Sequence, residues 1–148
     1  MRAVIGVGIA ALALVVAGAA FGDDDPVHAR QQLMKMNNAS AKAAFGMIKG
    51  TTPYDATQAA AQMNQIATDI ETFVTLLPPD SANAAGTYAS PDIWTNMDDF
   101  KALATKLDTD AKAAAAAAAG GVDAFKVAFA AVNSDCSACH KKYRLSDD

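Results

Sequence analysis

Apolar residues recur at intervals of three and four along most of the chain, which is the spacing that places side chains on one face of an α-helix. Four such stretches are separated by glycines and prolines, at about residues 26–49, 55–77, 91–119 and from 122 to near the C-terminus. Prolines and small polar residues between 78 and 90 predict a loop. The connections do not require a long crossover, so the pattern predicts an all-α, antiparallel up-down-up-down four-helix bundle.

The apolar stripe of the last stretch runs on into the chain's two cysteines. Its members are Val122, Phe125, Phe129, Val132, Cys136, Cys139 and Tyr143. Both thiols are therefore expected on the inward face of the last helix. The alanine-rich end of the third stretch is low in complexity, but alanine has the highest helix propensity, so we predict helix there as well.

The first 22 residues differ from the rest. A positive start at Met1-Arg2 precedes an apolar run over residues 3–20, followed by small residues and then acidic ones. This order predicts a cleaved signal peptide at residues 1–22 and a mature domain at residues 23–148. A membrane anchor is the alternative, because the run nearly reaches spanning length. We favour cleavage, with no stable membrane anchor afterwards, and export to the periplasm of a Gram-negative bacterium.

Composition and charge narrow the function classes. Hydrophobic residues make up 52% and charged residues 19% of the 148 positions, which indicates a packed globular domain. The formal net charge of −4 argues against nucleic acid as a partner. The chain lacks a phosphate-binding glycine loop, a nucleophile elbow and a zinc-protease motif, so we expect no enzyme of these classes.

The main chemical signal is the motif Cys136-Ser137-Ala138-Cys139-His140. Cysteines three residues apart on a helix can form thioethers with one haem, and the following imidazole can bind its iron. We predict one haem c per chain, attached at Cys136 and Cys139 with His140 as an iron ligand. Zinc binding, thiol–disulfide chemistry and a short structural disulfide are weaker alternatives. The only other histidine, His28, is predicted to lie on the surface.

The bundle topology also suggests a second iron ligand. His140, near the end of the fourth helix, should lie level with the start of the first, where Met34 is about 12 Å along at 1.5 Å per residue. Met34 is our candidate for the distal ligand, and Met97 is the competitor at that end. Met36 should point away from Met34, and Met47 and Met63 should lie toward the opposite end. An iron with two such ligands suits one-electron transfer, whereas an open position binds a small gas.

Several stretches together resemble class II c-type cytochromes, the cytochrome c′ family. Besides the C-terminal motif, they are Arg30-Gln31-Gln32-Leu33-Met34-Lys35, Pro53-Tyr54-Asp55 and Ser90-Pro91-Asp92-Ile93-Trp94. The resemblance implies that His140 is the proximal ligand, that Arg30 and Gln31 lie near a haem propionate and that Arg144 screens the imidazole. Leu33-Met34-Lys35 is more similar to the low-spin, six-coordinate subgroup, in which this methionine is the distal ligand. Some five-coordinate members carry a methionine there that does not bind.

The predicted function follows from these residues. We expect a soluble periplasmic electron carrier that exchanges single electrons with redox partner proteins. The alternative is a five-coordinate protein that binds or sequesters nitric oxide or carbon monoxide. Leu33, Leu77, Trp94 and the loop over residues 78–90 are expected to lie near the ring, and a homodimer is a further possibility.

Overall fold

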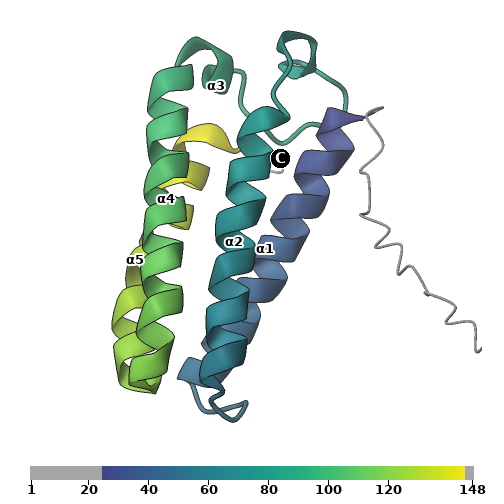
Figure 1. Cartoon of the computed structure of the whole chain (residues 1–148). Coiled ribbons are helices and arrows are strands. Elements are labelled where there is room, and N and C mark those ends of the chain that lie inside the picture. Colours follow the sequence, from purple (N-terminus) through teal and green to yellow (C-terminus); the bar gives the residue numbers. More distant parts are fainter. Residues whose placement is uncertain (1–24, 146–148) are drawn as a thin grey trace, which may run out of the picture.

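Four long helices lie side by side in the computed structural model, which describes residues 25–145 (Figure 1). They are α1 (Pro26–Ile48), α2 (Ala56–Thr75), α4 (Met97–Ala117) and α5 (Val122–Tyr143). Three short elements, η1 (Pro79–Ser81), α3 (Asp92–Thr95) and η2 (Ala118–Gly120), lie in the connections. Within residues 25–145 there is no strand, only an isolated antiparallel bridge between Ala89 and Arg144. The predicted four-helix bundle is confirmed.

The start of the chain carries two predictions of its own. The predicted signal peptide lies outside residues 25–145, and the domain division at residue 22 stays a prediction. In the part of the chain that the structure describes, no helix combines the length and apolar character needed to cross a membrane.

The helix ends have local causes that the sequence contains. The carboxylate of Asp25 accepts hydrogen bonds from the backbone amides of Val27 and His28 at 3.0 and 3.1 Å, and so caps α1. Asp55 caps α2 in the same way by accepting from the amide of Gln58 at 2.9 Å. Gly121, with φ of +92°, starts α5 in a conformation that other residues rarely adopt. Three of the predicted helices therefore match the structure to within about two residues.

The predicted third helix is wrong in one respect, because it is divided near its start. The chain leaves helical geometry at Asn96, with φ of −128° and ψ of 41°, between α3 and α4. Two contacts hold the short α3 apart from the following helix. The indole of Trp94 donates to the carbonyl of Pro78 at 3.2 Å, and the side-chain amide of Asn96 donates to the carbonyl of Asp92 at 3.1 Å.

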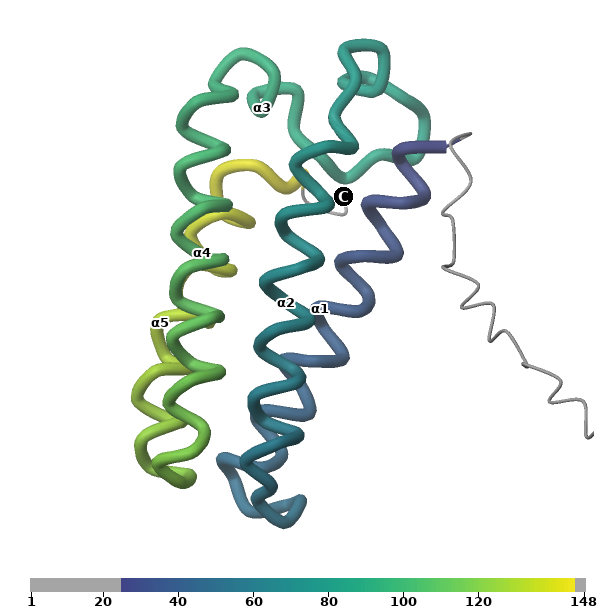
Figure 2. The backbone as a smooth tube through the Cα atoms, viewed as in Figure 1, coloured from purple at the N-terminus to yellow at the C-terminus, as the bar shows by residue number. Residues whose placement is uncertain are grey.

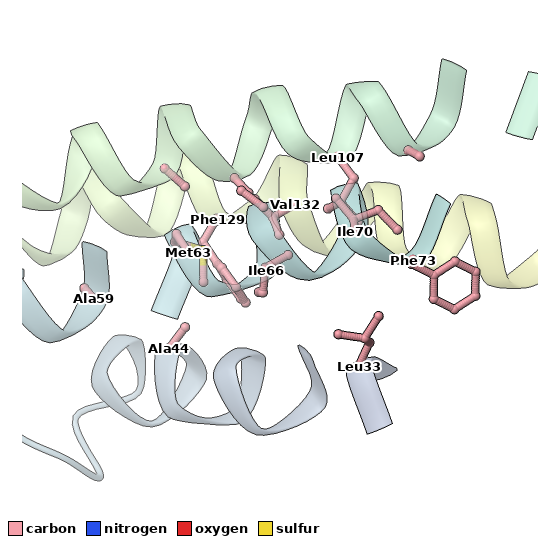
Figure 3. Packing of buried hydrophobic residues seen from close by; sticks show 14 of the residues in the cluster. Leu33, Ala44, Ala59, Met63, Ile66, Ile70, Phe73, Leu107, Phe129 and Val132 are labelled. Atoms are coloured by element: carbon pink, nitrogen blue, oxygen red, sulfur yellow. The ribbon is translucent and has the colours of Figure 1, made fainter. Parts of the chain in front are cut away.

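The core runs along the whole bundle and takes residues from all four long helices (Figure 3). In Figure 3, Leu33 and Ala44 of α1 face side chains of α2, among them Met63 and Ile66. The alanine-rich part of α4 also belongs to the core, since Ala111 and Ala114 have no exposed surface. Small side chains at these positions let the neighbouring helices approach closely.

The two ends of the bundle differ in how far α1 lies from α4. The starts of α1 and α4 and the ends of α2 and α5 share one end, as the topology predicts (Figures 1 and 2). Figure 2 shows α1 tilted so that its start lies farther from α4 than its end does. At the opposite end Phe45 of α1 packs edge-on against Phe129 of α5, with ring centroids 4.9 Å apart. Phe45 remains 37% exposed despite this contact.

Candidate haem site

The predicted attachment cysteines lie on the last turns of α5. Cys136 and Cys139 are half-buried, pack against the core and are not bonded to each other. Because residues three apart on a helix differ by about 60° around its axis, both thiols lie on one side of α5. His140 is rotated by only about 40° from Cys136, so its imidazole starts from the same side. The structure therefore presents two thiols and an imidazole together, as haem attachment requires.

The protonation state of the thiols bears on the alternatives to haem. Burial raises the pKa of both thiols, to about 11 for Cys139. Thiol–disulfide enzymes need the opposite, a lowered cysteine pKa that produces thiolate near neutral pH. Among residues 25–145 there is also no group of three histidine, cysteine, aspartate or glutamate side chains placed to hold a metal ion. The raised thiol pKa values therefore do not favour thiol–disulfide chemistry.

The imidazole of His140 borders an open depression of about 420 Å³, lined by His140, Lys141, Arg144 and Leu145. His140 is exposed overall, but the neighbouring protein removes enough water from its ring to lower its pKa, and the positive charge of Arg144 lowers it further. A lowered pKa favours the neutral imidazole, which is the form that binds iron. The predicted proximity of Arg144 to the His140 imidazole agrees with this electrostatic effect.

Contacts with distant segments hold the end of α5 in place. The amide of Ser90 donates to the carbonyl of Tyr143 at 2.9 Å, and the amide of Leu145 donates to the carbonyl of Tyr88 at 2.8 Å. The hydroxyl of Tyr143 donates to the carboxylate of Asp99 on α4 at 2.5 Å. The loop over residues 78–90 and the start of α4 therefore position the helix turn that carries the motif.

Arg30 holds the other side of the same loop. Its guanidinium donates to the carbonyl of Leu76 at 2.6 Å, to the hydroxyl of Ser81 at 2.9 Å and to the hydroxyl of Thr87 at 3.3 Å. Arg30 is only 3% exposed, yet no carboxylate lies within ion-pair distance of it among residues 25–145. The charge of Asp25 acts on Arg30 from outside ion-pair distance, and a buried cation that is not ion-paired at this end of the bundle is suited to a propionate of haem.

The other predicted contacts are arranged around Arg30. Gln31 donates through its amide to the carbonyl of Gly86 at 2.8 Å, so it binds the loop. Half-buried Trp94 lies beneath the Arg30 guanidinium, whose carbon is 5.7 Å from the ring centroid. Leu33 is 3% exposed and belongs to the main core. The structure thus brings Arg30, Gln31 and Trp94 together at one loop. Leu33 follows Arg30 by three residues on α1 and lies in the core.

Met34 lies on the side of α1 that faces α5. It is eleven residues before Phe45, which amounts to a rotation of only about 20° around the helix, and Phe45 contacts Phe129 of α5. The side chain of Met34 is half-buried and packs against the core. Met97, the predicted competitor, is also half-buried, at the first position of α4. The direction of Met34 is therefore compatible with a distal ligand.

The other methionines and the second histidine differ in their exposure. Met36 is 37% exposed, and Met47 and Met63 are buried. His28 is exposed, and its ring nitrogen lies 3.0 Å from the side-chain amide of Gln32.

Sequence reasoning did not find the residues that tie the loop down. Ser81 and Thr87 bind Arg30, which precedes them by more than fifty positions, and Asp99 binds Tyr143 from 44 positions away. In the sequence, these three are ordinary polar residues of a loop and of a helix start. No local pattern distinguishes them from exposed loop residues.

Comparison with known proteins agrees with this arrangement. Residues 25–144 match the family model described as Cytochrome C′. Cytochrome c-556 of Agrobacterium tumefaciens (strain II Chrys) is 37% identical over 119 residues, which cover 80% of this chain and 96% of that protein.

Solved structures of the same kind are also similar. A cytochrome c′ described as having an unusual ligand-controlled dimer dissociation superposes with a TM-score of 0.75 at 27% identity, covering 82% of this chain and 95% of that one. A ferrous variant of cytochrome c prime from Alcaligenes xylosoxidans with bound NO gives a TM-score of 0.74 at 28% identity, covering 83% and 95%. These matches do not support assigning the chain to the predicted low-spin, six-coordinate subgroup. The chain belongs to the cytochrome c′ family, and its cofactor is one covalently attached haem c with iron.

Proposed function

We propose that this chain is a periplasmic one-electron redox protein whose haem is bonded to Cys136 and Cys139 and whose iron is bound by His140. The observation that carries the proposal is the end of α5, where two half-buried free thiols and an imidazole lie on one side of a single helix. When bound, haem supplies an iron that accepts and releases one electron. The family match supports the cofactor, and the site residues are our assignment.

The chain's own residues prepare this site. The lowered pKa of His140 keeps its imidazole neutral and available to iron near neutral pH. The raised pKa values of Cys136 and Cys139 keep both thiols protonated and protect them from oxidation before attachment. Arg30 offers a buried positive charge to a propionate and holds the loop over the same end of the bundle. These residues position a haem and need no substrate pocket.

The sixth coordination position separates two candidate functions. The comparisons lend more support to the binding of a small gas, because a similar structure carries bound NO. Electron transfer through a six-coordinate iron draws its support from Met34, which is half-buried on the side of α1 that faces α5. Gas binding requires a sixth position that Met34 leaves open, so the same residue decides between the two.

Optical spectra of the purified holoprotein test both the site and the sixth ligand. Cys136→Ser combined with Cys139→Ser should abolish covalent haem attachment, and haem retained after denaturation would refute the assignment. If Met34 binds the iron, the ferric protein should be low-spin with a methionine-to-iron charge-transfer band, and Met34→Ala should remove that band. High-spin ferric iron in the unmodified protein would exclude the six-coordinate form and favour gas binding.

Met97→Ala is the matched control, because Met97 is the other half-buried methionine at this end of the bundle. We expect Met97→Ala to leave the spectrum unchanged. Nitric oxide titration of the ferrous protein supplies the complementary measurement. If the sixth position is open, the unmodified protein should bind the gas readily. If Met34 is a ligand, the gas should bind readily only to Met34→Ala.

The proposed setting has two further parts. We propose that the mature protein works in the periplasm with redox partner proteins, in agreement with the predicted signal peptide. We also propose a homodimer, which the ligand-controlled dimer dissociation described for a similar cytochrome c′ supports. Sedimentation of the holoprotein with and without nitric oxide tests this, and a monomer at every concentration would refute it.

A further inference from the structure

A carboxylate of α5 is buried directly beside the haem-attachment motif. Asp135 precedes Cys136 and is only 6% exposed. Its Oδ1 accepts from the ammonium of Lys106 on α4 at 2.6 Å, and the same ammonium donates to Asp110 at 2.7 Å. Lys106 itself remains largely in water, with 57% of its side chain exposed. One cation therefore serves two carboxylates across the interface between α4 and α5.

The second oxygen of Asp135 shows that this cluster is incomplete. Its Oδ2 is buried and has no hydrogen-bond partner among residues 25–145. Asp110 and Asp135 accept from the same ammonium at 2.7 and 2.6 Å, so the two carboxyl groups lie close enough to act on each other's pKa. An ionised carboxylate can only accept, so a proton bound by this pair would remove one of two neighbouring negative charges and turn a carboxylate oxygen into a donor.

The two carboxyl groups differ in their affinity for this proton. Burial raises the pKa of Asp135, whereas the hydrogen bond from Lys106 lowers the pKa of Asp110. The charged groups that act on Asp135 in the described part of the chain are Lys106 and Asp110, both from α4. Asp135 in turn raises the pKa of Cys136 on its own helix, after the larger effect of burial. The buried member of the pair is thus the one that favours the neutral form.

The position of the pair makes it sensitive to the charge of the haem. Asp135 lies directly before the attachment residue Cys136 and five residues before His140, which is about 7.5 Å along the helix axis and about 140° around it. An electron arriving at the iron adds one negative charge to this region, and nearby negative charge stabilises the protonated form of a carboxyl group. By linkage, a proton bound at the pair must favour the reduced iron to the same extent.

We propose that Asp110 and Asp135 form a proton-binding site that takes up a proton from water when the haem iron of this chain is reduced. The electron comes from a one-electron donor such as a reduced redox protein, and the ferric iron becomes ferrous. The proton neutralises one negative charge of the pair, and oxidation releases it again. This inference rests on the proposed function, because it requires haem at Cys136 and Cys139.

The dependence of the haem reduction potential on pH tests the site in the holoprotein. We expect the potential to fall as pH rises through the titration of the pair, because the deprotonated pair disfavours an added electron. Asp135→Asn should remove this part of the pH dependence and raise the potential on the alkaline side. Asp123→Asn is the matched control, since Asp123 is an exposed carboxylate in the first turn of the same helix. It should leave the potential curve unchanged.

Infrared difference spectra between the oxidised and reduced protein give a second readout, in which the band itself is measured on the unmodified protein and the variants assign it. Reduction should produce the carbonyl stretch of a neutral carboxylic acid, and Asp135→Asn or Asp110→Asn should remove it. The proposal is overturned if this band is absent, or if Asp135→Asn follows the same potential curve as the unmodified protein. A chain without covalent haem would overturn the proposed function as well, whereas covalent haem with unchanged curves would overturn only this inference.

Discussion

Replacing Arg30 should weaken the bundle at the end that holds the haem. The Arg30→Met change keeps an unbranched side chain of similar reach and removes the guanidinium. It deletes the donors to Leu76, Ser81 and Thr87 and the contact with the Trp94 ring. The loop over residues 78–90 then loses the hydrogen bonds from Arg30 but keeps the one from Gln31 to Gly86, and its hydrogen bonds to the end of α5 remain.

The size of the effect follows from opposing contributions. Hydrogen bonds from a charged donor contribute about 1.5–3 kcal/mol each, and the stacking on an aromatic ring adds about 0.5–2 kcal/mol. The buried guanidinium offsets part of this, since taking a charge out of water costs several kcal/mol. We expect Arg30→Met to lower the free energy of unfolding by about 2–4 kcal/mol. Arg30→Lys should fall in between, because an ammonium cannot reproduce the planar fork that reaches three acceptors.

Urea denaturation of the holoprotein, followed by circular dichroism, measures this loss. Lys35→Met is the control, because Lys35 is exposed on the next turn of α1 and should change stability by less than about 0.5 kcal/mol. Hydrogen exchange adds a local readout: a loop held less firmly on α1 opens more often, so the amide of Leu145, which donates to the loop carbonyl of Tyr88, should lose part of its protection in Arg30→Met. If Arg30→Met were as stable as the unmodified protein, the three hydrogen bonds would not outweigh the burial of the charge, and the reasoning would be refuted.

Three other changes test the fold. Burial raises the pKa of Asp69, so the native state holds a proton that the unfolded chain loses above about pH 4, and stability should decline as pH rises above that point. Asp69→Asn should lack this decline. If the urea midpoints of the variant and of the unmodified protein changed by the same amount between pH 4 and pH 7, the prediction would be contradicted. Phe129→Ala removes a 3% exposed ring that contacts Phe45 and should cost about 3–5 kcal/mol in urea unfolding, with a loss under about 1 kcal/mol arguing against tight packing there. Tyr54→Phe deletes a 2.6 Å hydrogen bond to the carbonyl of Ala118 and should cost about 0.5–1.5 kcal/mol in the same assay, and no change would show that water replaces it.

The helices and the attachment motif could be predicted because their causes are local. Asp25 and Asp55 cap the helices that follow them, and Gly121 begins the last one. The apolar stripe of α5 already places Cys136 and Cys139 toward the core. The exception is the break at Asn96, which depends on where the distant carbonyl of Pro78 meets Trp94.

The burial of charged groups could not be predicted, because it depends on residues far away in the chain. Arg30 lies on a helix whose other cations, Lys35 and Lys42, are exposed, and its burial comes from residues 46 to 57 positions later, at the end of α2 and in the loop. Asp135 stands in the short polar run 133–135 before the motif, and nothing in that run indicates that it is more deeply buried than its neighbours. The cation that it needs belongs to α4, 29 positions earlier.

By itself, the sequence determined that the chain forms four amphipathic helices and carries one haem-attachment motif on the inner face of the last. Both properties depend on residues a few positions apart, whose spacing on a helix is known in advance. Only the tertiary structure decided that Arg30 is a buried cation at the haem end and that Asp110 and Asp135 meet around Lys106. The electrostatic environment of a site depends on which side chains lose water, and that is set when distant helices pack together.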